Sequence, residues 1–118
     1  MQVFTAVLAL IIAGGIVSPA RAQSSLPAAA EHDFVVRNFR FASGETLPEL
    51  KLHYRTLGAP RRDSAGIVRN AVMVLHGTGG SGAGFLSLTF GEELFGSGQL
   101  LDATQYFIIL PDGIGHGQ

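Results

Sequence analysis

Residues 71–84 read AVMVLHGTGGSGAG: an apolar run stops at His76 and turns at once into a loop rich in glycine. A short run of Val, Met and Leu before a turn predicts a buried strand of a parallel sheet, covered on both faces. Glycine lacks a Cβ, so the loop backbone can approach a ligand closely and its amides can line an anion-sized hollow. The glycines of the loop are Gly77, Gly79, Gly80, Gly82 and Gly84. The strand end therefore indicates a site that stabilises negative charge.

Two nucleotide-binding loops fit this stretch poorly. A phosphate-binding P-loop needs a Lys followed by Ser or Thr at its end, and the chain has no Lys after Lys51. A dinucleotide fingerprint, G-x-G-x-x-G, is present over residues 77–82, but it needs an acidic residue at the end of the next strand. Asp102 has the right spacing and precedes the next apolar run, whereas Asp112 follows that run about ten residues too late.

A loop that holds an oxyanion fits better. In such loops an HG pair is followed by small residues, and a backbone amide points at the negative oxygen that develops during acyl transfer. His76, Gly77 and Thr78 match this pattern, and by position the amide of Thr78 is the best candidate donor. The alternative is a glycine-rich turn without a catalytic role, in which His76 is a histidine at a strand end whose ring nitrogens have ordinary hydrogen-bond partners.

A second apolar run also ends abruptly in a turn that contains glycine. Residues 106–117 read YFIILPDGIGHG, which predicts a buried strand over residues 106–110 followed by a turn. Residues 87–101 between the two strands predict a helix, short because three glycines interrupt it, and thus one crossover unit. Asp112 lies in a Pro-Asp-Gly turn signal, so we interpret it as a turn or cap carboxylate rather than a catalytic acid.

The region before the first motif predicts two strands, residues 34–41 and 50–57, joined by a turn at residues 42–45. They form a hairpin at the sheet edge. His53 falls on the opposite face from Leu52 and Tyr54, so we expect it to face solvent.

Three stretches together resemble a known family: FASGETLPELKLHYRTLG (41–58), NAVMVLHGTGGSG (70–82) and LDATQYFIILPDGIGHG (101–117). Their order is similar to the α/β-hydrolase superfamily and, within it, to the homoserine O-acetyltransferase branch. The resemblance implies an α/β fold, the N-terminal part of an α/β-hydrolase, with an antiparallel edge hairpin followed by a parallel β-α-β unit. It also implies an acyl-transfer or ester-hydrolysing site with a Ser, Asp, His triad and a covalent acyl-enzyme.

The sequence departs from this family at the nucleophile. The nucleophile elbow, G-x-S-x-G, follows the strand that corresponds to residues 106–110, and the sequence ends at Gln118 before reaching it. Ser81 lacks the last glycine of the pattern, and the family order places the acid and base later, so neither His76 nor His116 is the catalytic base. We therefore expect an oxyanion donor without nucleophile, acid or base.

Whether these residues alone form an enzyme stays open; the alternatives are an inactive truncated product and a small module that binds an anion with its glycine loop.

The N-terminal segment predicts export. Residues 3–17 are mostly apolar, and residues 18–22, SPARA, supply an A-x-A cleavage pattern. We expect a signal peptide over residues 1–22, a flexible lead-in over 23–32 and the hydrolase portion over 33–118. The apolar run is shorter than the roughly 20 residues that span a bilayer. The mature protein would then be periplasmic or secreted, with no membrane contact after cleavage.

Composition and charge limit the kinds of ligand and partner that we expect for this protein. The chain has 118 residues, a formal net charge of −1 and no cysteine, which excludes disulfides and thiolate metal sites. Its four histidines lack metal-ligand spacing, so we expect neither a metal nor a cofactor. The sequence has no basic patch of the kind that binds nucleic acid. We interpret Arg61 and Arg62 as residues of a solvent-exposed turn. The expected partner is a small acyl or ester substrate, and the oligomeric state stays open.

Overall fold

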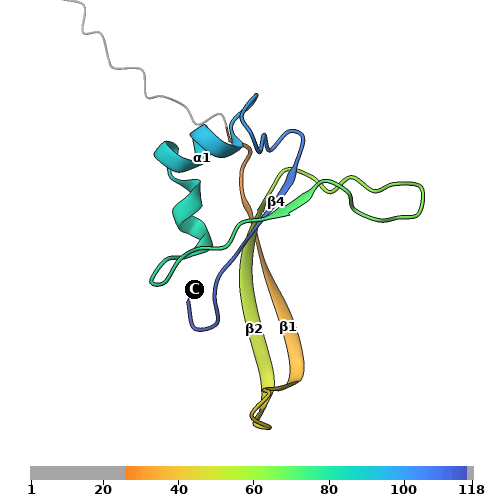
Figure 1. The fold of residues 1–118 in the computed structure, drawn as a ribbon, viewed down its shortest axis with the longest axis vertical. Coiled ribbons are helices and arrows are strands. Elements are labelled where there is room, and N and C mark those ends of the chain that lie inside the picture. Colours follow the sequence, from red (N-terminus) through yellow and green to blue (C-terminus); the bar gives the residue numbers. More distant parts are fainter. Residues whose placement is uncertain (1–25, 117–118) are drawn as a thin grey trace, which may run out of the picture.

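The computed structural model describes residues 26–116 (Figure 1), so the predicted signal peptide, residues 1–22, lies outside the described residues. In chain order the elements are β1 (Ala30–Arg40), β2 (Thr46–Leu57), β3 (Ala71–Met73), the 3-10 helix η1 (Gly82–Leu86), α1 (Leu88–Phe95) and β4 (Phe107–Pro111). β1 begins inside the predicted lead-in, because residues 30–32 already pair with β2. None of the described helices is long and apolar enough to span a membrane.

β1 and β2 form the predicted antiparallel hairpin. Its turn is closed by hydrogen bonds from Phe41 N to Glu45 O (2.9 Å) and from Gly44 N to Phe41 O (2.9 Å). Gly44 has a φ of +98°, a left-handed conformation that glycine adopts without steric cost. β2 pairs with β4 only from Tyr54 onward, so the turn end of the hairpin extends beyond the rest of the sheet (Figure 1).

The four strands form one sheet in the order β1-β2-β4-β3. β2 and β4 are antiparallel, whereas β3 and β4 are parallel, with Val72 opposite Ile108. The connection from β3 to β4 runs through η1 and α1, as a parallel pair requires a crossover. The predicted hairpin followed by a parallel β-α-β unit is therefore confirmed.

The core lies between one face of the sheet and α1. Its buried cluster comprises Leu57, Phe95, Ala103, Ile108 and Leu110. Successive side chains of a strand point to opposite faces. Ile108 and Leu110 of β4 are fully buried in this cluster, whereas Phe107 and Ile109 are only half-buried. The described helices thus cover one face of the sheet.

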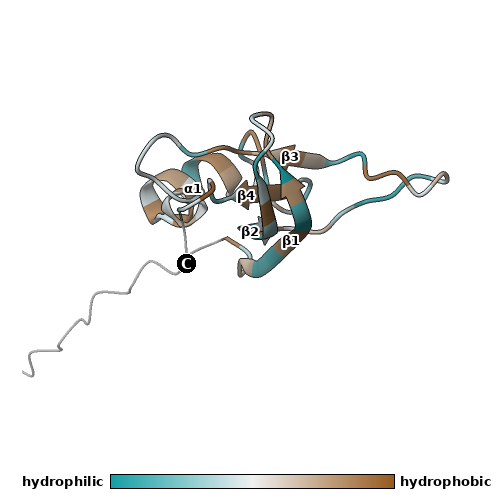
Figure 2. Cartoon of the chain, turned by 90° about the horizontal axis from the view of Figure 1, so that it is seen from below, coloured by the Kyte–Doolittle hydropathy of each residue, from teal (hydrophilic) through white to brown (hydrophobic). Residues whose placement is uncertain are grey.

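The prediction that residues 71–75 are buried on both faces is wrong. Met73 is 60% exposed and Leu75 is 70% exposed. The reason is the place of β3, which lies at the rim of the sheet beside β4 alone. Figure 2 shows its apolar residues at this rim, where no other described strand pairs with its outer edge.

The short helix predicted within residues 87–101 is confirmed as α1. It begins after Ser87, whose Oγ accepts a hydrogen bond from Phe90 N (3.4 Å), and it ends at Gly96, whose N–H binds Glu92 O. Phe95 is buried in the core, whereas Leu88 at the other end is 57% exposed. Phe95 thus connects α1 to the core cluster.

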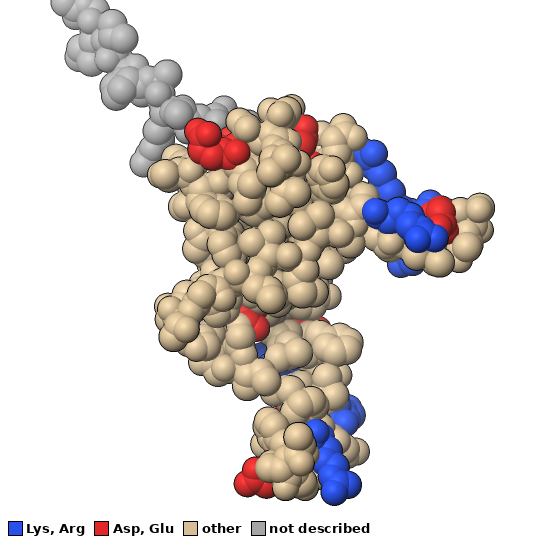
Figure 3. Space-filling view, viewed as in Figure 1, with Lys and Arg blue, Asp and Glu red and all other residues tan. Residues whose placement is uncertain are grey.

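The loop between β2 and β3, residues 58–70, protrudes from the sheet, and basic side chains gather on it (Figure 3). Arg62 Nη1 donates to Gly66 O (2.7 Å), and Arg61 Nη2 donates to Thr104 O (2.8 Å). Both arginines are exposed, and Arg61 also donates from Nη1 to Gln105 Oε1 (3.4 Å), so both make their hydrogen bonds within the protein itself.

Candidate functional site

β3 and β4 end side by side, so the two glycine-containing loops meet at one edge of the sheet. Pairing continues one residue beyond β3, where Val74 N donates to Ile109 O (3.0 Å). A cavity of about 230 Å³ opens there, lined by Leu75, His76, Pro111, Asp112 and Gly113. Ligands of α/β sheets bind outside the carboxyl ends of parallel strands, and this cavity has that position.

His76 joins the two loops. Its Nε2 accepts a hydrogen bond from Gly113 N (2.8 Å), and its Nδ1 lies 2.8 Å from Gly77 O. A neutral imidazole has one N–H and one acceptor nitrogen. Because Nε2 accepts, the proton lies on Nδ1, which donates to Gly77 O. His76 is therefore a satisfied histidine that fixes the start of the loop.

The residues after His76 form a type II turn. Gly80 N donates to Gly77 O (3.0 Å), and Gly79 has the φ of +78° that this turn requires at its third residue. Gly77 O thus accepts hydrogen bonds from both His76 and Gly80. Its orientation is fixed from two sides.

The same turn fixes the amide of Thr78. A trans peptide is planar, so the N–H of Thr78 points away from the oxygen of Gly77. Gly77 O faces the turn and the ring of His76, which directs the Thr78 N–H to the other side. Among the described residues this N–H has no hydrogen-bond partner, and Thr78 is exposed. A held, unoccupied amide is the feature that an oxyanion donor needs.

Asp112 anchors the far end of the loop. Its Oδ1 accepts a hydrogen bond from Gly82 N (2.6 Å), and its Oδ2 accepts one from Arg55 Nη1 (3.3 Å). Arg55 in turn donates from Nε to Glu31 Oε1 (2.9 Å). The carboxylate therefore has a structural role, but its backbone partner lies 30 residues earlier in the chain rather than in its own turn.

The prediction that His53 faces solvent is wrong. Its side chain is only 12% exposed, and its Nδ1 lies 3.0 Å from Asp33 Oδ1. Asp33 stands directly opposite His53 in the hairpin, and the chain after β4 crosses beside it, where Asp112 N donates to His53 O (2.9 Å). The hydrogen bond from His53 is the main reason that the pKa of Asp33 lies below its ordinary value, and Lys51 acts in the same direction.

Sequence reasoning missed the cross-strand pairs that join Glu31 to Arg55 and Asp33 to His53. The signal was present in the hairpin, because a turn at residues 42–45 places each acid opposite its partner. An acidic residue directly opposite an arginine or a histidine indicates such a contact.

Other residues near the site have ordinary structural roles. Asp102 accepts hydrogen bonds from Gly98 N (2.7 Å) and Thr104 N (2.8 Å), so it stabilises its own turn and is not placed to bind a ribose. Ser81 precedes η1 and makes no capping hydrogen bond to it. The described residues contain no group of three or more His, Asp or Glu arranged to hold a metal ion.

The chain is similar in sequence to two curated proteins, although no family model matches it. It is 32% identical over 80 residues to homoserine O-acetyltransferase of Leifsonia xyli subsp. xyli, which covers 65% of this chain and 20% of that protein. It is 43% identical over 47 residues to a probable acyltransferase of Methanothermobacter thermautotrophicus, which covers 40% of this chain and 15% of that protein.

Solved structures show the same architecture. Homoserine O-acetyltransferase from Bacillus anthracis matches with a TM-score of 0.57 and 23% identity, over 74% of this chain and 24% of that one. Esterase E22 matches with a TM-score of 0.56 and 18% identity, over 72% of this chain and 24% of that one. The chain thus spans about a quarter or less of the length of these proteins.

The described residues have the fold of the N-terminal part of an α/β-hydrolase. In sequence the chain is similar to homoserine O-acetyltransferase, as its motifs predicted, and the fold is shared by a homoserine O-acetyltransferase and by an esterase.

Proposed function

We propose that the complete protein is an exported acyl-transfer enzyme of the serine type, either an ester hydrolase or an O-acyltransferase. In this proposal His76, Gly77 and Thr78 form the oxyanion loop, and the Thr78 N–H is one oxyanion donor. The observation that carries it is the Thr78 N–H, which the turn after the cavity-lining residue His76 fixes without a hydrogen-bond partner among the described residues. The similarity to a probable acyltransferase, a homoserine O-acetyltransferase and an esterase supports the same reaction class.

The proposed mechanism is the one that the α/β-hydrolase fold implies for the complete protein. A serine on an elbow beyond residue 118 would attack the carbonyl carbon of the acyl group and form a tetrahedral intermediate. The Thr78 N–H and the amide after that serine would hold its negative oxygen. A next parallel strand would pair with the outer edge of β3 and so end beside residues 76–78. Transfer and hydrolysis differ only in whether an alcohol or water accepts the acyl group.

The signal-like sequence of residues 1–22 bears on the acceptor. Export would separate the enzyme from cytosolic acyl-CoA, which favours hydrolysis of an ester in the periplasm or medium. The similarity to homoserine O-acetyltransferase favours transfer. We expect cleavage after Ala22, so N-terminal sequencing of the exported protein should find Gln23 first, and detection of Met1 would contradict export with cleavage.

A proline at position 78 tests the oxyanion donor. Proline is well tolerated at the second residue of a type II turn, so Thr78→Pro removes the N–H while it keeps the turn. In the full-length gene product we expect kcat to fall about 100- to 1,000-fold with little change in KM, because the donor acts mainly on the transition state. Thr78→Ala retains the N–H and serves as the matched control, with kcat close to that of the unchanged protein.

The assays use p-nitrophenyl acetate for hydrolysis and acetyl-CoA with homoserine for transfer. Activity on one of them identifies the acceptor, whereas activity on neither contradicts the proposed function. Equal kcat values for Thr78→Pro and Thr78→Ala would leave the enzyme class intact and remove Thr78 from its site. The DNA beyond codon 118 supplies an independent check, because the proposal requires G-x-S-x-G followed by an Asp and a His.

A further inference from the structure

We propose that Arg55 is a positioning residue of the oxyanion loop. It holds the carboxylate of Asp112, and through that carboxylate it holds Gly82 at the far end of the loop. The inference rests on the proposed function of residues 76–78, but the contacts that carry it are independent of any activity.

The relay from β1 to the loop is continuous and mostly buried. Glu31 Oε1 accepts from Arg55 Nε (2.9 Å), Arg55 Nη1 donates to Asp112 Oδ2 (3.3 Å), and Asp112 Oδ1 accepts from Gly82 N (2.6 Å). The side chain of Asp112 is 0% exposed and that of Arg55 is 11% exposed, whereas Glu31 at the surface is 61% exposed. The relay thereby links β1, β2, the segment directly after β4 and the loop.

Arg55 is the positively charged partner of the buried Asp112 carboxylate. A buried carboxylate without a positive partner is strongly unfavourable, so loss of the guanidinium favours a rearrangement that brings water to the carboxylate. Such a rearrangement weakens the hydrogen bond from Gly82. Glu31 fixes the guanidinium from its other side, so its donors point at Asp112.

Gly82 has little freedom to settle elsewhere. A Cβ at this residue would lie 2.5 Å from Leu110 O, which shows how closely the backbone approaches β4. The loop is thus held at two points: His76 binds Gly113, and Gly82 binds Asp112. Both anchors are adjacent residues after β4. Release of one anchor lets the intervening residues move and so changes the orientation of the Thr78 amide.

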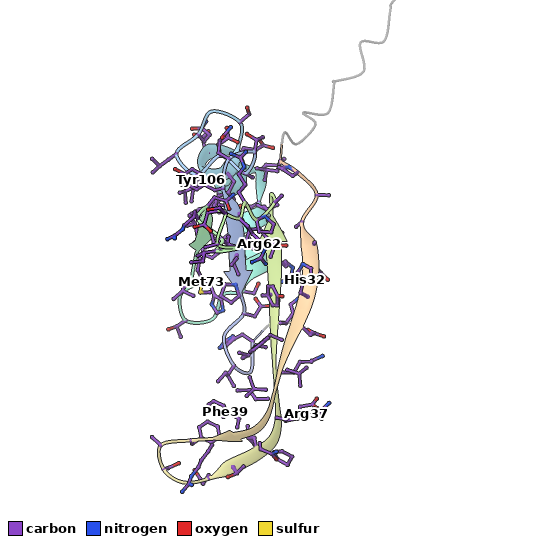
Figure 4. All side chains as sticks on the ribbon, turned by 90° about the vertical axis from the view of Figure 1, so that its right-hand side faces the viewer. His32, Arg37, Phe39, Arg62, Met73 and Tyr106 are labelled. Atoms are coloured by element: carbon purple, nitrogen blue, oxygen red, sulfur yellow. The ribbon has the colours of Figure 1, made fainter. Side chains whose placement is uncertain are left out.

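The test compares three variants of the full-length gene product. Arg55→Met removes the charge with little loss of volume, and Arg55→Lys keeps a charge without the two-sided contact that the guanidinium makes. Arg37→Met is the matched control, because Arg37 also pairs with an acid across the hairpin (Glu49, 3.2 Å) but lies toward its turn (Figure 4). Amide hydrogen exchange at Gly82, kcat and KM are measured for each.

For Arg55→Met we expect Gly82 to exchange roughly tenfold faster or more, and kcat to fall on the order of 10- to 100-fold with KM nearly unchanged. Arg55→Lys should lie between Arg55→Met and the unchanged protein, and Arg37→Met should match the unchanged protein. A lower melting temperature for Arg55→Met with unchanged Gly82 exchange would assign Arg55 a merely structural role and overturn the proposal.

Two further outcomes can be distinguished from a failure of the proposed relay. If Arg55→Met does not fold, Arg55→Lys decides: faster exchange at Gly82 with unchanged exchange along β1 and β2 supports the relay, and unchanged exchange at Gly82 overturns it. If the gene product has no acyl-transfer activity, the proposed function fails, whereas the exchange at Gly82 still tests whether Arg55 positions the loop.

Discussion

Single residues hold the two strand ends together. Both ring nitrogens of His76 form hydrogen bonds with backbone groups, one in each loop. Both carboxylate oxygens of Asp112 also accept hydrogen bonds, one from the backbone of the glycine loop and one from the Arg55 side chain of β2. Neither side chain is free for proton transfer in this arrangement. Their contribution is the shape of the loop, which leaves the amide of Thr78 as the available hydrogen-bond donor.

Gly82→Ala tests this close approach at the scale of one residue. A Cβ there would lie 2.5 Å from a backbone oxygen of β4, which cannot move without disturbing the sheet. We expect a loss of about 1–3 kcal/mol of stability, the usual cost of overpacking, measured by denaturant unfolding of the gene product.

Gly84→Ala is the matched control for that change, because it lies in the same 3-10 helix and a Cβ there would meet no atom within 4 Å. Its effect should be near zero or slightly stabilising, by about 0.4–1 kcal/mol at most. Equal losses for the two variants would show that helix propensity, and not contact with β4, governs position 82.

At the scale of elements, the connection from α1 to β4 depends on Asp102. Its carboxylate accepts the N–H groups of Gly98 and Thr104, and the residue is almost fully buried. The hydrogen bond from Gly98 is the main reason that the pKa of Asp102 lies below its ordinary value of 3.8, and those from Thr104 act in the same direction. The ionised form is therefore the one that stabilises this turn.

The pH dependence follows from that sign. A folded-state pKa below the unfolded value gives stability that is present at neutral pH and is lost as the pH falls through the lowered folded-state value. We expect Asp102→Asn to melt at a lower temperature than the unchanged protein at pH 7. Below about pH 4 the difference should shrink, because the carboxyl group takes up a proton first in the unfolded state and then, at lower pH, in the folded state as well. Melting curves between pH 3 and pH 7 measure it, and a difference that does not vary with pH would contradict the assignment.

At the scale of the molecule, the described residues cover one face of the sheet. The other face carries a cavity of about 340 Å³ lined mainly by apolar side chains, among them Phe34, Met73 and Ile109. The outer edge of β3 is unpaired among the described residues, and unpaired edges promote association with other chains. Both surfaces are of the kind that further strands and helices cover in a complete α/β sheet.

We therefore expect residues 23–118, expressed by themselves, to be poorly soluble and to have no activity in either acyl assay. Size-exclusion chromatography and denaturant unfolding measure this directly. A monomeric product that unfolds cooperatively would contradict the expectation. Phosphate should give that segment no protection against heat, and clear protection would favour the anion-binding module instead.

Local sequence patterns were enough to predict most of the elements. Period-two alternation and the Ser-Gly-Glu turn predict the hairpin, and two apolar runs ending in glycine loops predict the parallel pair with a short helix between them. The HG pair and its glycines predict the loop whose third residue, Thr78, has the held amide. These features depend on residues close together in the chain, which is why they are readable from it.

Burial and the choice of partner are decided by segments that are distant in the chain. β3 is exposed because the order of the strands places it at the rim, His53 is buried because the chain after β4 passes beside it, and Asp112 binds an amide 30 residues away. An apolar run looks the same at the rim of a sheet as at its centre, and a Pro-Asp-Gly turn does not specify which N–H its carboxylate will meet. Long-range packing determines both, because it sets which groups lose water and which hydrogen bonds can replace it.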